Sequence, residues 1–171
     1  MKDQQVWEQG LIHVGKRFAS LVPHKKQQLM DLIAEYRQGK EALTEILTSL
    51  DSEAVCCDCG GKCCFNGKYR LNVFDVLALY SSGIQISADF EKKPLCPYGT
   101  CQGCIMEPGL RPADCVLFVC DLLDERLSVA AKSSVISLEI TIRKCLQRAS
   151  LVMGEPLEMA LLLWSEKLKD E

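Results

Sequence analysis

The sequence predicts a mainly α-helical protein whose helices pack around a loop-rich, cysteine-ligated metal-binding insert. Apolar residues recur at helical spacing in the first fifty residues and again after residue 121. Residues 94–112 between them are rich in proline and glycine, which favours loops. Ten of the eleven cysteines fall between Cys56 and Cys120. We therefore expect one domain, residues 1–171, with an N-terminal helical hairpin (1–50), a cysteine-cluster metal-binding region (51–120) and C-terminal helices (121–171).

Composition is that of an ordinary globular protein. Apolar residues make up 48% of the 171 residues and charged residues 25%, enough apolar surface for a core that folds without disulfides. The net charge of −3 argues against a nucleic-acid or anionic-membrane partner. The start of the chain is polar, and no apolar run is long enough to span a bilayer. These observations predict a cytoplasmic protein.

The first fifty residues predict two helices. The first carries an apolar stripe, and Pro23 ends it; the second carries another stripe whose phase continues across Gly39, which favours one long helix. The first stripe consists of Trp7, Leu11, Val14, Phe18 and Leu21. We expect the two helices to pair as an antiparallel hairpin in the core. The alternative is that this hairpin binds a protein partner or forms a homodimer interface.

Further helices are expected beyond the first cysteines. Asn72 is a plausible N-cap for a short helix that Gly83 ends, with Asp75 a solvated carboxylate and Tyr80 a core aromatic. Pro112 fits the first turn of a helix that would carry both Cys115 and Cys120. Cys145 stands alone on the apolar face of a later helix, where it is expected to be a packed core thiol.

The density of cysteines points to metal chemistry. The cytosol keeps thiols reduced, and the odd count would leave one thiol over in a full disulfide framework, so disulfides rank below metal. Cys56-x-x-Cys59 allows two thiolates on a tight turn to reach one ion. His13 and His24 lie in predicted helices without ligand-like spacing, so sulfur would be the only donor. All-sulfur coordination suits zinc or an iron–sulfur cluster.

The Cys63-Cys64 doublet indicates more than one metal centre. Neighbouring side chains in an extended chain point to opposite sides, so each cysteine could serve a different centre. Eight cysteines then divide into two groups of four, for two zinc ions or one or two clusters. A helical conformation at the doublet would weaken this argument.

The order of the cysteine motifs is specific. Cys56-x-x-Cys59-Gly60-x-x-Cys63-Cys64 is followed by Cys96-Pro97, Gly103-Cys104-Ile105 and Arg111-Pro112-x-x-Cys115-x-x-Phe118-x-Cys120. Over residues 56–120, this arrangement resembles the YkgJ-like cysteine-cluster family, which is described as a zinc- or iron-chelating domain. The resemblance implies eight metal ligands: Cys56, Cys59, Cys63, Cys64, Cys96, Cys104, Cys115 and Cys120.

The chain also departs from that pattern. The family block is usually C-x-x-C-x-x-C-C, and here one extra residue precedes the doublet. Cys57 and Cys101 are additional, so either could replace a neighbouring ligand. Arg111 would either hydrogen-bond a thiolate, offsetting its charge, or close the loop before the helix at Pro112.

No enzyme signature is evident in the sequence. It has no G-x-G-x-x-G, G-x-S-x-G or H-E-x-x-H, and Gly60-Gly61-Lys62 lacks the remaining features of a phosphate loop. The predicted function is a cytoplasmic protein that holds zinc or an iron–sulfur cluster through cysteines, with a structural, redox or metal-handling role. Flagellin lysine methylases look like members of the same group, so a cluster-dependent modifying enzyme is one alternative. A purely structural zinc interaction module is the other.

Overall fold

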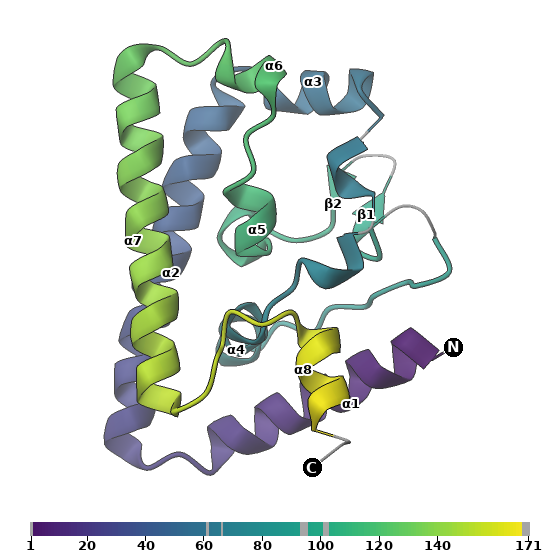
Figure 1. Cartoon of the computed structure of the whole chain (residues 1–171), viewed down its shortest axis with the longest axis vertical. Coiled ribbons are helices and arrows are strands. Elements are labelled where there is room, and N and C mark those ends of the chain that lie inside the picture. Colours follow the sequence, from purple (N-terminus) through teal and green to yellow (C-terminus); the bar gives the residue numbers. More distant parts are fainter. Residues whose placement is uncertain (1, 61, 66, 93–95, 101–102, 169–171) are drawn as a thin grey trace.

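The computed structural model describes residues 2–60, 62–65, 67–92, 96–100 and 103–168, and it is mainly helical, as the sequence predicts. Figure 1 shows two long helices side by side, with the shorter elements and the first helix arranged on one side of them. In chain order the elements are α1 (Lys2–Ala19), α2 (Pro23–Thr48), α3 (Ser52–Asp58), the 3-10 turns η1 (Lys62–Cys64) and η2 (Gly67–Tyr69), α4 (Val73–Ser81), β1 (Gly99–Thr100), β2 (Gly103–Cys104), the 3-10 turn η3 (Pro108–Leu110), α5 (Ala113–Val116), α6 (Asp121–Asp124), α7 (Val129–Met153) and α8 (Leu161–Lys167).

The long helices α2 and α7 run antiparallel and pack along their lengths (Figure 1). α2 starts with Pro23 in its first turn and continues without a break through Gly39, which confirms the single long helix. A Cβ atom at residue 39 would lie 3.1 Å from the Ile142 side chain, so glycine allows the two helices to approach closely. On α7, Ile142 and Cys145 are fully buried, and Cys145 is the core thiol that the sequence predicts.

The predicted hairpin of the first two helices is wrong. α1 packs against α8 and α4, whereas α2 packs along α7 (Figure 1). The reason lies in the burial: Val6, Trp7 and Val14 on α1 are covered by elements that follow residue 70, because α2 buries its own apolar face against α7. Periodicity identified both helices correctly, but it does not specify their packing partners.

α4 is fixed at its N-terminus by both side-chain and backbone bonds. The Asn72 side chain accepts from the Asp75 backbone N–H, and the Asp75 carboxylate accepts from the Asn72 N–H, forming a capping box as the predicted N-cap requires. Backbone bonds run from Val73 N–H to Met159 O and from Leu161 N–H to Leu71 O. The segment after the first cysteine block is therefore anchored to the chain before α8.

Within the described part of the chain, no helix combines the length and the apolar character needed to cross a bilayer. The core is a continuous cluster that draws on α1, α2, α4, α7 and α8 and extends to Cys96, Tyr98 and Met106 in the cysteine region. The cysteine region therefore shares its apolar packing with the helices that flank it.

Candidate metal centre

The first cysteines lie on a helix, which corrects the expectation of a loop from residue 51. Cys56 and Cys57 belong to α3, and Cys59 forms its C-cap. Cys59 donates from Sγ to the Cys56 carbonyl oxygen over 3.4 Å. Residues three apart lie on one helical face, so Cys56 and Cys59 share a side, whereas Cys57 is turned away by about 100°. This helix has seven residues, and Val55 is its single buried residue. The sequence therefore contains no apolar repeat from which the helix could be recognised.

The Cys63-Cys64 doublet lies in η1, so its conformation is helical and not extended. The argument that extended neighbours point to opposite sides therefore does not apply. Burial is the main factor that raises the pKa of both Cys63 and Cys64, and the interaction between the two thiols further raises the pKa of Cys63 and opposes the rise at Cys64. Successive residues of a 3-10 helix are still rotated by about 120°, so the two sulfurs need not serve one centre.

The remaining predicted ligands come from three later segments. Cys96 is buried beside Gly67, where a Cβ atom would lie 2.7 Å from Cys96 Sγ, so that close approach needs glycine. Cys104 lies on β2, pairs with Gly99 of β1, and accepts at Sγ from the Met106 N–H over 3.5 Å. Cys115 lies on α5 and Cys120 is the N-cap of α6, so the single helix expected to carry both is two short helices.

The fold brings these segments together. α3 contacts both β2 and α6, so the chain around Cys56 lies against the chain around Cys104 and Cys120 (Figure 1). Burial raises the pKa of Cys56, and the charges of Cys63, Cys59 and Cys120 raise it further. These four thiols are here called the α3 group: Cys56, Cys59, Cys63 and Cys120.

The charges of the other four predicted ligands also affect one another's pKa. These four are called the hairpin group, after the short β1–β2 hairpin that carries Cys104: Cys64, Cys96, Cys104 and Cys115. Burial raises the pKa of Cys115 strongly, and the charges of Cys96 and Cys104 add to that rise. The pKa of Cys64 is also raised by Cys96 and Cys104, and by Cys56 of the α3 group. The charges of the eight cysteines that the family resemblance implies therefore affect one another's pKa, within and between the two groups.

The side chains are not arranged as a finished coordination sphere. Among the described residues, no group of three or more His, Cys, Asp or Glu side chains has the geometry to hold a metal ion. The ten cysteines in the described ranges are all free thiols. Cys101, which the sequence offers as an alternative ligand, lies outside the described residues. The chemistry of the donors fits a soft metal, but the thiols would have to turn towards one another to bind it.

Two arginines lie close to the thiols. Arg111 lowers the pKa of Cys56, against the larger effect of burial, and its Nε donates to the Met106 carbonyl over 3.2 Å. The bond to Met106 fits the role of closing the loop, whereas no hydrogen bond from Arg111 to a thiol is found among the described residues. Arg70 was not identified from the sequence: it lowers the pKa of Cys96 and Cys115, also against burial, and donates to the Asp114 carbonyl over 3.2 Å. An isolated arginine between motifs gives no signal in the sequence.

A buried ion pair supports the chain that leads to Cys115. Lys40 and Asp75 have no exposed side-chain surface and are joined by 2.9 Å between Nζ and Oδ1. Lys40 also donates to the Arg111 carbonyl over 2.8 Å, and the second oxygen of Asp75 accepts from the Ala113 N–H over 3.3 Å. Burial lowers the pKa of Lys40, and the nearby carboxylate opposes that change. The pair therefore links α2 and α4 to the start of α5.

The aromatic partners of this pair differ from expectation. Tyr36 donates to Asp75 over 2.8 Å and places its ring 4.1 Å from Lys40 Nζ. Asp75 was expected to be solvated and is instead fully buried, whereas Tyr80 was expected in the core and is 52% exposed. The burial of Asp75 was missed because the positive charge that compensates its carboxylate comes from Lys40 on α2, far away in the sequence. The local pattern of α4 gives no sign of this partner.

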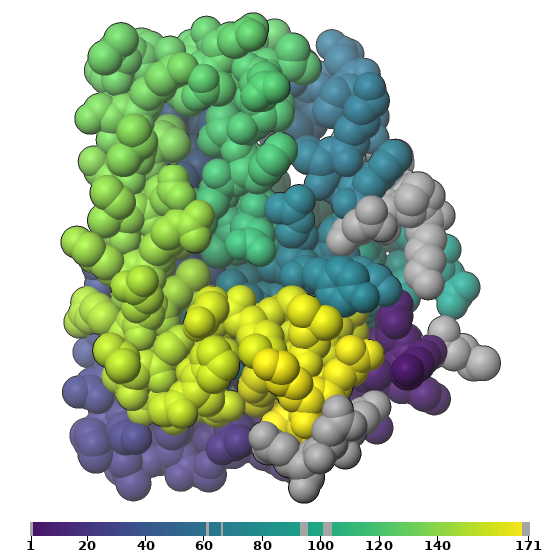
Figure 2. All heavy atoms as spheres, viewed as in Figure 1, coloured from purple at the N-terminus to yellow at the C-terminus, as the bar shows by residue number. Residues whose placement is uncertain are grey.

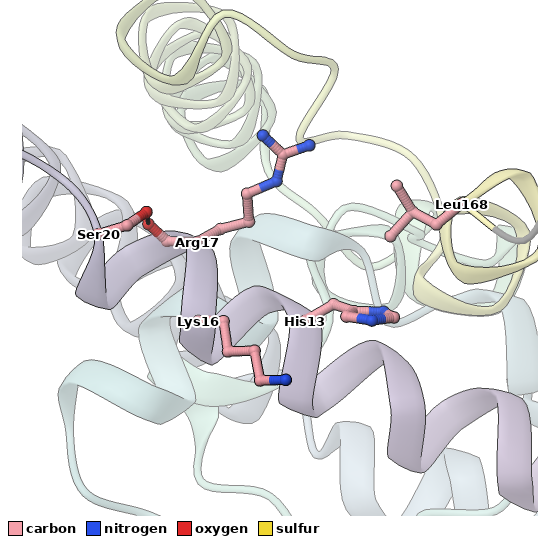
Figure 3. A pocket seen from close by; sticks show the side chains of 5 residues that line it. All are labelled: His13, Lys16, Arg17, Ser20 and Leu168. Carbon is pink, nitrogen blue, oxygen red and sulfur yellow. Dashed lines mark hydrogen bonds between the residues drawn. The ribbon is translucent and has the colours of Figure 1, made fainter. Parts of the chain in front are cut away.

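Two hollows on the surface lie apart from the cysteines. The first, of about 400 Å³, is lined by His13, Lys16, Arg17, Ser20 and Leu168 and opens at the C-terminal end of α1 (Figure 3). Basic side chains are favoured there by the helix dipole. The second, of about 360 Å³, lies between α2 and α7. No cysteine lines either hollow, so neither belongs to the candidate centre.

Comparison with known proteins returned no family model, no curated protein and no solved structure that matches this chain.

Proposed function

We propose that this protein binds metal through its cysteine thiolates, in two centres formed by the α3 group and the hairpin group. One observation carries the proposal: eight cysteines from four separate segments of the chain lie near enough to change one another's pKa. Unpaired cysteines that serve only as small apolar residues are dispersed through a core, as Cys145 is. Four sulfurs per centre suit tetrahedral zinc or an iron–sulfur cluster.

The neighbouring residues support this proposal in different ways. The positive charges of Arg70 and Arg111 favour thiolates over thiols in the cluster, against the effect of burial. Lys40 and Asp75 hold the chain before Cys115 to the helical core. A metal would supply Lewis acidity if it were zinc, or electron transfer if it were an iron–sulfur cluster.

The first experiment is to measure zinc, iron and acid-labile sulfide on protein purified without oxygen, together with its visible absorption. About two zinc ions per chain in colourless protein would support two four-sulfur sites and a structural or metal-handling role. Iron and sulfide in coloured protein would support a redox role or the cluster-dependent modifying enzyme. Absence of bound metal after reconstitution with either one would overturn the proposal.

Serine variants identify the ligands. Cys64→Ser and Cys115→Ser remove one thiol each from the hairpin group, and we expect each to lower the bound metal by about half if the two centres fill independently. Cys57→Ser is the matched control, since Cys57 is exposed on α3 and is turned away from Cys56. Cys145→Ser tests the buried core thiol, and its metal content should also remain unchanged. Equal metal loss in Cys57→Ser and Cys64→Ser would contradict the assignment.

A further inference from the structure

The outer face of α7 carries a line of exposed apolar side chains. Val129 is 88% exposed, Ile136 57%, Ile140 48% and Leu151 82%. Because each residue of a helix is rotated by about 100°, these four lie within an arc of about 60°, which also carries the exposed polar residues Ser133 and Gln147. The opposite face of α7 is buried against α2. Figure 2 shows α7 along one edge of the molecule, with no other segment in front of it.

A helix surface of this kind needs a partner of matching pattern, and the pattern matches itself. Val129 and Leu151 each lie eleven residues from Ile140, on opposite sides of it. If a second copy of α7 packs antiparallel with Ile140 facing Ile140, then Val129 of each copy faces Leu151 of the other. Ile136 faces Lys144 in this arrangement, and the aliphatic stem of that lysine can cover an apolar side chain while its ammonium stays in water.

The charges beside the apolar line are also complementary in this arrangement. Glu139 and Arg143 lie on the same flank of α7 and already form an ion pair within the chain, 2.8 Å between Oε1 and Nη2. In the antiparallel pair, Glu139 of one copy is level with residue 141 of the other. Arg143 and Glu139 of the other copy then lie at the same axial offset of about 3 Å, with Arg143 nearer to the middle of the interface. Each carboxylate would therefore have one guanidinium within its own chain and another across the interface, with the second carboxylate farther out on the flank.

We propose that α7 forms the interface of a homodimer, in which two copies pack antiparallel about Ile140 along Val129, Ile136, Ile140 and Leu151. The proposal does not depend on metal binding, because no cysteine of the α3 group or the hairpin group lies on α7. A single pair of helices buries less than the roughly 1,200–2,000 Å² of a standard interface, so the dimer should dissociate in the micromolar range.

Sedimentation equilibrium of the full chain, with a reducing agent to exclude intermolecular disulfides, tests this proposal. We expect a monomer–dimer equilibrium between about 1 and 200 µM, the range for a weak interface. Ile140→Glu places two carboxylates against each other at the two-fold axis and should weaken the dimer by more than about tenfold. Ile12→Glu changes an equally exposed isoleucine on α1 and should leave the dimer intact. A wild-type chain that stays monomeric throughout, or a dimer that persists in Ile140→Glu, overturns the proposal.

Charge reversal provides a test that does not depend on Ile140. Glu139→Arg places two arginines on the flank of each copy, and Arg143→Glu places two glutamates there, so each variant alone should dimerise more weakly than the wild type. An equimolar mixture should dimerise more strongly than either variant alone, because arginines then face glutamates. Circular dichroism confirms that both variants keep their helix content. A mixture no stronger than the separate variants would rule out the antiparallel arrangement.

Discussion

Lys40 is the residue whose replacement we expect to be most costly for stability. Lys40→Met leaves the fully buried Asp75 carboxylate without its cation, so the free energy of unfolding should fall by about 3–5 kcal/mol. Urea denaturation followed by circular dichroism measures the change. Lys16→Met, at an exposed position of α1, should stay within about 0.5 kcal/mol of the wild type. The double variant Lys40→Met/Asp75→Asn removes both charges and should recover part of the loss; no recovery would show that Lys40 stabilises by packing alone.

The raised pKa values of the thiols predict how the affinity for metal depends on pH. Burial raises the pKa of Cys56, Cys63, Cys64, Cys96 and Cys115, so these groups carry protons at neutral pH and must lose them to bind metal. Affinity therefore rises with pH, by up to about tenfold per pH unit for each proton released. Competition with a chromogenic zinc chelator at pH 6, 7 and 8 measures this slope. An affinity independent of pH would mean that the thiols are not the ligands.

At the scale of the elements, the short segments α3, η1, β1–β2 and α5 differ from the long helices. Most of their cysteines keep part of their surface in water while the surrounding chain partly desolvates the sulfur atoms, whereas α2 and α7 bury a continuous face against each other. We expect amide hydrogen exchange of residues 52–65 and 103–120 to slow by at least about tenfold when metal is added, because metal binding and local folding are linked. Exchange in α2 and α7 reports the opening of the whole fold and should slow only as far as metal stabilises the protein against global unfolding. Equal protection with and without metal would indicate that these segments are ordered by packing alone.

The same difference explains how much the sequence could predict. The long helices were predicted because apolar residues repeat at helical spacing, such as Leu29 and Leu43 on α2 and Ile142 and Leu146 on α7. The Asn72 cap was predicted because it has a local side-chain signature. The α2–α7 pairing was not, since nothing local to Gly39 specifies that Ile142 is its neighbour. The buried Lys40–Asp75 pair escaped prediction for the same reason. Motif order nominated eight cysteines as ligands, which stays a prediction, and the helical conformation of α3 and η1 could not be inferred from such short segments.

At the scale of the whole molecule, metal binding should stabilise the entire fold. Cys96 packs in the main core, and the chain before Cys115 is bonded to Lys40 and Asp75, so the cysteine region does not unfold independently of the helices. Zinc at 100 times its dissociation constant stabilises by about 2.7 kcal/mol, which corresponds to a rise in Tm of about 5–10 °C for a chain of this size. Scanning calorimetry with and without zinc measures the shift. Cys64→Ser/Cys115→Ser should reduce it, and an unchanged shift in that variant would place the zinc elsewhere.

The backbone bonds between residues 71–74 and 157–161 have a consequence for biosynthesis. A ribosome delivers residues 71–74, and then the last of the ten cysteines up to Cys120, before it delivers Leu157 and Leu161. About a hundred residues likewise separate the contacting parts of α2 and α7 in the sequence. Pairings between such distant segments are slow to form. The nascent chain therefore exposes most of its reduced thiols to the cell before the fold can shield them. Timely delivery of metal, or protection from oxidation during translation, would then determine the yield of folded protein.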